Sequence, residues 1–403
     1  MARRTKAEVA ALTTEIVKLA ERQAQEIVED ARRHARETRL EMEDWADGIL
    51  STLEVNLDKF LVAVKRGRER LHERSQETVV AGIYVLVRTS NAGATDIQDA
   101  TLSDGRPVWR HVADLHHLRG ASARPDAPAD LLIEIPHGAT RTEDFRAVEA
   151  LLKSPLPHGL SDFFHVNTDT GAPELAEAVA HALIEHEPRR TVTIVRCRIP
   201  RTFIDCNRRI DASPEEFRAG KVTPGLMPWI TDAEDRALLR GRYEQYVELV
   251  RAADAGLGPD GALLLLHTYA PRTVGVEVDA QIVESLHRAY RPEVEPTWPL
   301  RPEIDVIGRG TDGTCHSPPS VFEALREALA AIDVPVADSA TYPLHPSTLA
   351  WDHVERRPGR VICVEVRRDL LADPFDPFVE MRIGAAKVAR LSGPIASAIR
   401  RFW

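Results

Sequence analysis

Polar residues follow four short apolar runs of this sequence, and together they have the chemistry needed to hydrolyse an amide bond. The runs are LLIEI, TFIDC, ALLLL and RVICV, and the polar residues are His137, Asn207, Arg208, His267 and Glu365. Each run is typical of a buried strand, and open α/β sheets carry their chemistry at the carboxyl ends of strands. Histidines bind zinc, a glutamate transfers protons and a guanidinium binds carboxylates. The set therefore indicates a zinc-dependent amide hydrolase.

The two histidines occupy similar places, each at the end of a predicted strand. Pro136 ends the first strand, and Gly138 lets the backbone approach a ligand closely. A lone histidine after a strand is more often structural, but His267 repeats the arrangement of His137. We therefore predict one zinc ion per chain, bound by both histidines. A third ligand is normally a carboxylate, and the candidates near in sequence are Glu143, Asp144 and Asp169.

The segment RTFIDCNRR (201–209) is predicted to be a strand that ends in an anion-binding pair. Asp205 and Asn207 would share one face if the strand continues, and we expect Asp205 to orient a neighbour. Asn207 and Arg208 could bind a carboxylate through charge-assisted hydrogen bonds. The alternative is that the arginines of this segment are surface charges.

Glu365 lies inside an apolar run, VICVEV. A glutamate is costly to bury in a strand unless it is paired or functional. Burial would raise its pKa toward the range that suits general acid/base catalysis. The alternative is a salt bridge between Glu365 and Arg367 or Arg368.

From residue 129 onward the patterns of strand and helix alternate. Predicted strands cover 131–135, 190–196, 262–267, 334–337 and 360–366, and predicted helices cover 142–153, 173–187, 232–255, 319–332 and 377–401. This alternation predicts an α/β fold with a mostly parallel or mixed sheet flanked by helices. Before it, 78–90 resembles a strand and 91–128 resembles short strands and loops. His116 and His117 fall in that loop region, where we expect surface residues rather than ligands.

The N-terminal part of the chain has a helical pattern without chemistry. Apolar residues recur there at spacings of three and four, as at Val9, Leu12, Ile16 and Leu19. We predict a helical arm or hairpin over 1–76 and an α/β amidohydrolase domain over 77–403. The arm would pack on the body or join two subunits in a homo-oligomer, and the alternative is a regulatory or partner-binding arm.

The composition limits the class of protein. The 403 residues are 43% hydrophobic and 28% charged, which is typical of soluble globular proteins. No stretch approaches ~20 apolar residues, so we expect no membrane span. The net charge is −10 and no basic stripe is interleaved with aromatic residues, which argues against a nucleic-acid partner. The four cysteines have no metal-knuckle spacing and the N-terminus has no apolar segment of a secretion signal, so we expect a cytoplasmic protein with reduced thiols.

In their order and residue types, these motifs resemble those of the N-formylglutamate amidohydrolase family, within the wider zinc carboxypeptidase-like group. IPHGAT is similar to the family's Pro-His-Ser-Gly strand end, and RTFIDCNR is similar to its Arg-x-aromatic-aliphatic-Asp-x-Asn-Arg signature. LLHTYA matches its Asp-x-His-Ser motif in part, and VEVRRDLL matches its late Glu-x-x-Arg strand. NTDTGAPELAEAV resembles a Thr-Asp segment of the family. The resemblance covers residues 130–400, so it leaves the N-terminal arm unexplained.

The resemblance implies a role for each matched residue. His137 and His267 would be zinc ligands, and Asn207 with Arg208 would bind the substrate carboxylate. Glu365 would be the general acid/base, and Arg201 would polarise the scissile carbonyl.

The sequence also departs from the pattern. Thr140 stands where carboxypeptidases have a ligating glutamate, so Asp169 is our substitute ligand. Leu265 replaces the Asp of the Asp-x-His-Ser motif. The loop YPLHPSTLAWDH (342–353) replaces an expected Gly-Gly loop, so the substrate can differ from N-formylglutamate.

We therefore predict metal-dependent hydrolysis of an amide bond in an N-formyl- or N-acyl-amino acid such as N-formylglutamate, a small acidic molecule. One alternative is a peptidase that acts on short or glutamate-rich peptides. The other is a non-catalytic scaffold with an eroded active site, which Thr140 and Leu265 favour. Zinc content separates the scaffold from the enzymes, because a scaffold needs no zinc.

Overall fold

The structure is a computed structural model that describes residues 25, 111–219, 223–373 and 376–403. The predicted arm over 1–76 and the predicted strand over 78–90 lie outside these residues, apart from Gln25. The domain boundary and the subunit contact that we expect from the arm therefore stay predictions.

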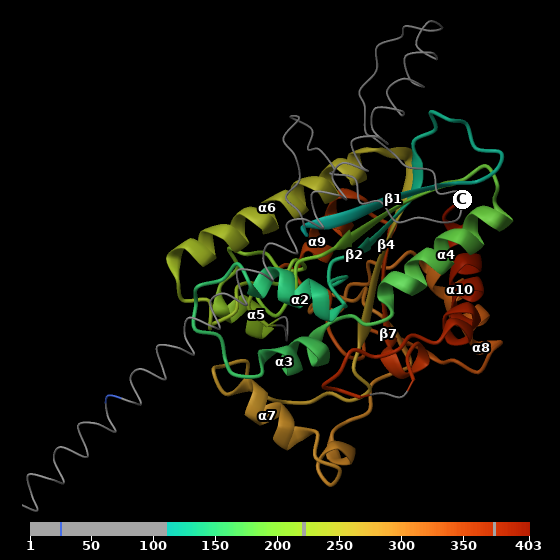
Figure 1. Cartoon of the computed structure of the whole chain (residues 1–403). Helices are drawn as coiled ribbons and strands as arrows, with labels where there is room; N and C mark the ends of the chain where they lie inside the picture. The colour runs from blue at the N-terminus through green and yellow to red at the C-terminus, as the bar shows by residue number, and fades with distance from the viewer. Residues whose placement is uncertain (1–24, 26–110, 220–222, 374–375) are drawn as a thin grey trace, which may run out of the picture. The chain divides into compact units, whose positions relative to one another are not determined.

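The described residues contain a seven-stranded sheet in the order β1-β3-β2-β4-β7-β5-β6 (Figure 1). The strands are β1 (Ala113–Arg119), β2 (Ala129–Ile135), β3 (Thr191–Cys197), β4 (Leu257–Tyr269), β5 (Ile304–Val306), β6 (Val336–Asp338) and β7 (Val361–Arg367). The four central strands β3, β2, β4 and β7 run parallel to one another. The edge strand β1 is antiparallel to β3, and β5 is antiparallel to β7 but parallel to β6. The predicted α/β fold with a mixed sheet is confirmed.

Helices cover both faces of this sheet. They are α2 (Thr142–Glu149), α3 (Leu160–Asn167), α4 (Ala172–His186), α5 (Pro214–Ala219), α6 (Ala233–Ala255), α7 (Ile282–Ala289), α8 (Pro319–Ala330), α9 (Leu349–Arg356) and α10 (Ala385–Ile399). The core on one face comes from α4, α8 and α10, and the core on the other face includes α2, α3, α6 and α9. No helix among the described residues is long and apolar enough to cross a membrane.

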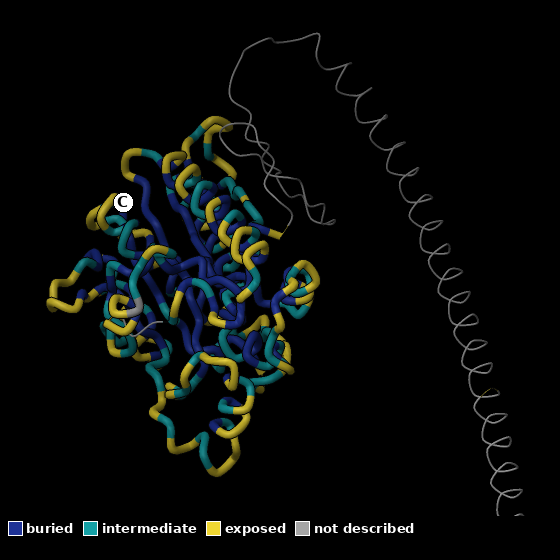
Figure 2. The backbone as a smooth tube through the Cα atoms, turned by 90° about the vertical axis from the view of Figure 1, so that its left-hand side faces the viewer, coloured by how far each residue is buried: buried dark blue, intermediate teal, exposed yellow. Residues whose placement is uncertain are grey.

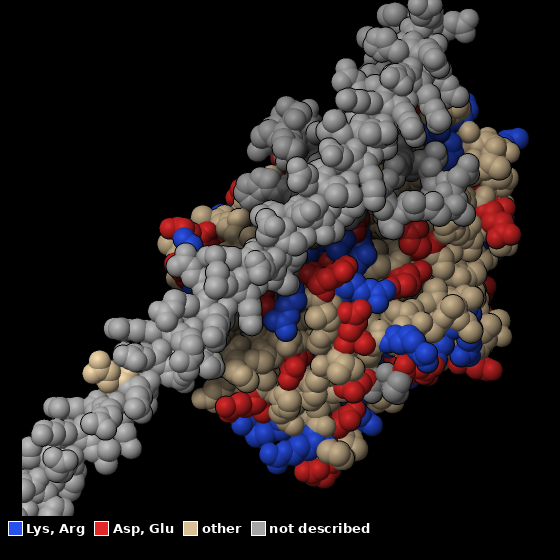
Figure 3. All heavy atoms as spheres, in the orientation of Figure 1, with Lys and Arg blue, Asp and Glu red and all other residues tan. Residues whose placement is uncertain are grey.

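The central strands explain the apolar runs of the sequence. In β4, Leu263 and Leu265 pack in one core while Leu264 and Leu266 pack in the other. Successive side chains of a strand point to opposite faces, so a strand that is covered on both faces needs apolar residues throughout. Figure 2 shows the result, with buried strands at the centre and exposed residues on outer helices and loops. On the face seen in Figure 3, acidic and basic side chains of the described residues are interspersed.

Several predictions of local structure were wrong. Residues 202–210 are not a strand, because β3 ends at Cys197 and the chain then turns. The N–H of Phe203 donates to the carbonyl of Pro200 at 3.0 Å, and the N–H of Asn207 donates to Asp205 Oδ1 at 2.9 Å. Proline lacks a donor for a strand ladder, and an aspartate that bonds the backbone two residues on favours a turn.

Other elements differ in place or extent. The pair His116 and His117 lies on β1 rather than in a loop. The closing helix α10 begins at Ala385, later than predicted. Part of the predicted loop 342–353 belongs to α9. The α-helices and strands that we did not predict are α3, α5, α7, α9 and β5.

A buried polar cluster fixes α9, whose first residues line the cavity described below. Glu134 of β2 accepts a hydrogen bond from the Tyr246 hydroxyl at 2.8 Å and lies 2.6 Å from His353 Nε2. Burial by itself would raise the pKa of Glu134, but the charge and hydrogen bond of His353 and the Tyr246 hydrogen bond hold that pKa below its usual value. The cluster therefore ties β2 to α6 and α9.

Candidate metal centre

Two histidines and an aspartate meet at the carboxyl ends of β2 and β4. His137 follows β2, His267 lies near the end of β4, and Asp169 lies between α3 and α4. Because β2 and β4 are parallel neighbours, their carboxyl ends lie side by side. The exposed fractions are 3% for His137, 1% for Asp169 and 2% for His267, so all three side chains are removed from bulk water.

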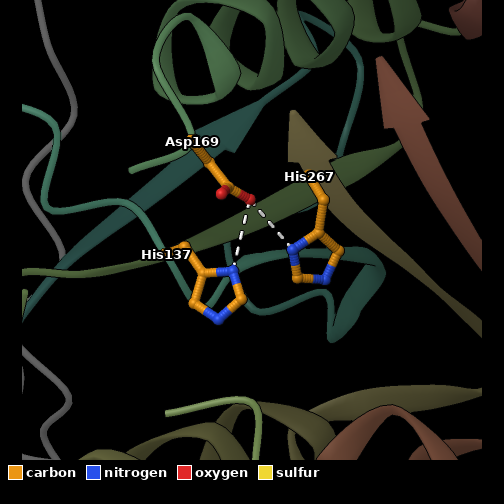
Figure 4. A group of neighbouring side chains, drawn as sticks. All are labelled: His137, Asp169 and His267. Carbon is orange, nitrogen blue, oxygen red and sulfur yellow. Dashed lines mark hydrogen bonds and ion pairs between the residues drawn. The ribbon is translucent and has the colours of Figure 1, made fainter. Parts of the chain in front are cut away.

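Both imidazoles turn the same ring atom toward one carboxylate oxygen (Figure 4). Asp169 Oδ2 lies 3.3 Å from His137 Nδ1 and 3.0 Å from His267 Nδ1. The N–H of Thr268 donates to the same oxygen at 3.2 Å. Burial by itself would raise the pKa of Asp169, but the charge and hydrogen bonds of His137 and His267 hold that pKa below its usual value. Asp169 is therefore an anion at neutral pH.

These three side chains fit a zinc ion. Among the described residues, they form a group whose possible ligand atoms all lie within 4.8 Å of one another. Two imidazole nitrogens and one carboxylate oxygen are a donor set of catalytic zinc sites, which keep a further position open. The other two candidate carboxylates lie elsewhere: Asp144 pairs with Arg198, and the Glu143 side chain is 78% exposed. The geometry favours Asp169 as the third ligand.

Asp205 orients the first histidine. Its side chain is fully buried, and Oδ1 lies 2.7 Å from His137 Nε2. Burial by itself would raise the pKa of Asp205, but the charges of Arg208, His137 and Arg201 hold that pKa well below its usual value. An ionised carboxylate only accepts hydrogen bonds, so His137 donates from Nε2. Nδ1 is then the ring nitrogen that can bind a metal ion next to Asp169.

A carboxylate behind a ligating histidine fixes the ring and raises its basicity. We expect Asp205→Asn to weaken zinc binding by roughly 10- to 100-fold, the usual effect of such a change. Competition with a chromophoric chelator measures this affinity.

Asp235→Asn is the matched control. Asp235 lies in the first turn of α6 and is also buried, but it accepts hydrogen bonds from the backbone N–H groups of Lys153 and Ser154. The control variant should bind zinc like the wild type, and thermal unfolding of both variants reports any loss of fold. Unchanged zinc affinity in a folded Asp205→Asn protein would show that Asp205 does not support the metal centre.

Glu365 lies beside the candidate metal centre and makes no hydrogen bond or ion pair with the other described residues. In the register of β4 and β7 it is opposite His267. Burial raises the pKa of Glu365 to about 7, with His267 opposing the rise and the charge of Asp169 adding to it. Its Oε2 atom is buried and has no hydrogen-bond partner among the described residues.

The alternative salt bridge of Glu365 is wrong. Arg367 pairs with Asp369 at 2.8 Å and with Glu303 at 3.4 Å. Arg368 donates through Nη1 to two backbone carbonyls, 2.7 Å from Val166 and 3.3 Å from His165. Glu365 is thus a buried glutamate with no cationic partner among the described residues, and its pKa lies near neutral pH. These are the properties of a general acid/base.

The predicted anion-binding pair faces the same site. Arg208 is buried and donates through Nε to the carbonyl of Thr223 at 3.2 Å, so a surface role for it is wrong. Its Nη2 lies 3.4 Å from Asp205 Oδ2, and Arg201 Nη2 donates to the same oxygen at 2.9 Å. Asn207 accepts a hydrogen bond from the N–H of Ala350 at 3.2 Å. A guanidinium has five N–H groups, so these contacts leave donors of Arg208 for a ligand.

A cavity of about 250 Å³ joins these residues. The predicted site residues that line it are His137, Arg201, Asn207, Arg208, His267 and Glu365. Arg301 and Arg368 also line it and were not predicted to contact substrate. Arg301 lies over the rings of Tyr269 and Tyr342, 5.0 and 5.7 Å from their centroids. Nothing local in the sequence marks these two arginines, because their place depends on the fold.

Comparisons with known proteins give no family. No protein-family model and no curated protein sequence matches the chain. Among solved structures, the chain is similar to a gene product of Agrobacterium tumefaciens, with 15% identity, a TM-score of 0.39, and coverage of 72% of this chain and 94% of that one. It is similar to a metallo-carboxypeptidase from Burkholderia cenocepacia, with 12% identity, a TM-score of 0.33, and coverage of 75% and 63%.

A third similar structure is a succinylglutamate desuccinylase from Vibrio parahaemolyticus, with 11% identity, a TM-score of 0.32, and coverage of 73% and 69%. These TM-scores are low, so the function proposed below rests on the side chains of this chain. The resemblance to N-formylglutamate amidohydrolases stays a prediction.

Proposed function

We propose that this protein is a zinc-dependent hydrolase of an amide bond next to a carboxylate. The observation that carries the proposal is the convergence of three buried donors, His137, Asp169 and His267, beside a buried glutamate that has no partner in the described part of the chain. A zinc ion held by these donors supplies a Lewis acid that polarises a carbonyl and lowers the pKa of water. One ion per chain satisfies the site.

The side chains around the donors supply the remaining steps. Glu365 accepts a proton from the attacking water and delivers it to the leaving nitrogen, and a pKa of about 7 suits both transfers. Arg201 lies beside His137 and Asp205 and is placed to stabilise negative charge that develops on the carbonyl oxygen. Asn207 and Arg208 hold the substrate carboxylate, which orients the amide for attack.

The charge of the cavity supports an acidic substrate. Five arginines line it, namely Arg201, Arg208, Arg272, Arg301 and Arg368, and the carboxylate in the same lining is Glu365. N-formyl- and N-acyl-amino acids carry the required carboxylate beside an amide bond, and N-formylglutamate is the first member to assay. Thr140 does not argue for an eroded site, because Asp169 provides a carboxylate at the cluster. The cytoplasmic location and the homo-oligomer are proposed on sequence alone.

The test is hydrolysis of a panel of N-formyl- and N-acyl-amino acids by the full-length protein. We expect chelation to abolish release of the free amine and added zinc to restore it. Amidation of the substrate's α-carboxylate removes a charged hydrogen bond of roughly 1.5–3 kcal/mol, so kcat/KM should fall at least about tenfold. Arg208→Lys should reduce this discrimination, because lysine cannot make two parallel hydrogen bonds to a carboxylate.

Three results would oppose the proposal. Hydrolysis that survives complete removal of metal would exclude zinc from the reaction. A protein that is purified without zinc and does not take it up would instead favour the scaffold. Hydrolysis of peptides in preference to all N-acyl-amino acids would favour the peptidase.

A further inference from the structure

One wall of the cavity is apolar, although its floor at the strand ends is charged. The wall residues come from α3, from the segment 274–278 and from α7 and the residue that follows it. They are Phe163, Val166, Val274, Val276, Val278, Ile282, Leu286 and Tyr290. A formyl group has one carbon atom, so it would cover little of the wall surface that faces the cavity.

The middle of the wall is an extended segment with alternating character. Val274, Val276 and Val278 are half-buried and line the cavity, whereas Gly275 and Glu277 between them are exposed. Such alternation is what an extended chain shows when one face is covered and the other meets solvent. The three valines therefore present one continuous apolar strip to the cavity.

Contacts at both ends hold this strip in place. The N–H of Thr273 donates to the carbonyl of Pro299 at 2.9 Å, and the N–H of Ile282 donates to the carbonyl of Asp279 at 3.2 Å. In the middle, a Cβ added at Gly275 would lie 3.3 Å from the Trp298 ring, so the segment passes close to that side chain. The strip is thus formed before a ligand binds.

The helices of the wall are also fixed to each other. Helices α3 and α7 lie side by side (Figure 1), and His287 Nε2 lies 2.6 Å from Asp162 Oδ2 across them. Ile282 and Leu286 are buried in the same core as Phe163. A preformed apolar surface binds an apolar group without a cost for ordering.

We propose that the substrate carries an extended apolar group of several carbon atoms, which packs on this wall while its carboxylate faces the arginines. The proposal rests on the proposed function and narrows it to N-acyl-amino acids with an apolar acyl chain or an apolar amino-acid side chain. The shared chemistry is a flexible aliphatic or aromatic group attached next to the scissile amide. N-formylglutamate is then a poor substrate, because it has no such group.

The test uses two series of ligands that separate the two sources of the apolar group. One series lengthens the acyl chain on alanine from formyl to acetyl, butanoyl and hexanoyl. The other keeps a formyl group and lengthens the side chain from alanine to 2-aminobutyrate, norvaline and norleucine. Calorimetry on the zinc-loaded Glu365→Gln protein gives each Kd without turnover, and wild-type protein gives kcat/KM.

We expect Kd to fall about fourfold per added methylene in one of the two series, the effect of burying one CH₂ group. The series with the slope identifies the source. In that series the double variant Val276→Thr, Val278→Thr should bind the longest ligand at least ~fivefold more weakly, because hydroxyl groups would face the apolar chain. The affinity for N-formylalanine, the shortest ligand of both series, should change less than that for the longest ligand. Val247→Thr is the matched control, since Val247 on α6 is also half-buried but does not line the cavity.

The outcomes separate the two proposals. A Kd that is independent of chain length in both series overturns the apolar subsite, even if formyl ligands are hydrolysed. A slope that Val276→Thr, Val278→Thr leaves intact also overturns it, because the apolar group then lies elsewhere. A slope in binding without turnover of any ligand by the wild type retains the subsite and rejects the proposed reaction.

Discussion

Replacement of His267 by alanine is expected to remove the zinc ion and, with it, the amide hydrolysis. His267 supplies one of three donors in a buried cluster, and the remaining pair, His137 and Asp169, cannot close a stable site. A catalytic zinc lowers the activation free energy by several kcal/mol, so we expect kcat to fall by at least ~10³ when the zinc is lost. His137→Ala should behave in the same way. Elemental analysis of the purified proteins measures bound zinc, and the same samples are assayed for turnover.

His117→Ala is the control for this experiment. His117 lies on the edge strand β1, where Nδ1 is 3.0 Å from Thr193 Oγ1, and it is not part of the metal cluster. It should retain zinc and activity. Full zinc content in a folded His267→Ala protein would remove this residue from the metal centre. Asp169→Ala is a weaker test, because a water molecule could replace the lost oxygen.

Glu365→Gln is expected to keep the zinc ion and the fold but to lower turnover by at least ~10², the low end for a general base. Glutamine has the shape of glutamate but cannot accept the proton of water. The side chain makes no ion pair among the described residues, so its charge is not needed for stability. Zinc content, the temperature of unfolding and kcat measured on one preparation separate these effects.

The pH dependence gives a second readout for Glu365. Only the ionised carboxylate accepts a proton, so kcat/KM of the wild type should fall as the pH drops through the pKa of this group. Burial raises that pKa to about 7, and the positive charge of bound zinc moves it lower. The acid limb should therefore lie at or below about pH 7, and it should vanish from the residual activity of Glu365→Gln.

Glu303→Gln is the matched control, because Glu303 pairs with Arg367 away from the metal cluster. Its turnover should stay within about twofold of the wild type, as for most surface changes. Near-normal turnover in Glu365→Gln would assign proton transfer to another group.

The central strands could be predicted from the sequence, and so could the two histidines of the candidate metal cluster; Asp169 was predicted as a substitute ligand. The runs around Ile133, Leu264 and Val364 are apolar throughout because parallel strands covered on both faces require it. A histidine at the end of such a strand is placed by its local position, so His137 and His267 could be identified without knowledge of the rest of the chain. Glu365 was identified for a similar reason, since a charged residue within a buried strand is rare.

The contacts that these residues make depend on the tertiary structure. Asp169 was one of three candidate carboxylates, and only the packing of α3 and α4 against the strand ends brings it to the histidines. The segment 202–210 was taken for a strand because it begins with the apolar run TFIDC, yet the turns at Pro200 and Asp205 place its side chains at the candidate metal cluster. The sequence left a salt bridge between Glu365 and Arg367 possible, but in the structure Arg367 pairs with Asp369.

The apolar wall depended on the fold most of all. Its residues come from α3 and from residues 274–290, which are far apart in the chain and meet in space. The ends of the central strands can be identified locally because a strand that is covered on both faces is a continuous apolar run. A cavity wall has no such run, because it forms from the surfaces that separate segments present to one another once they have packed.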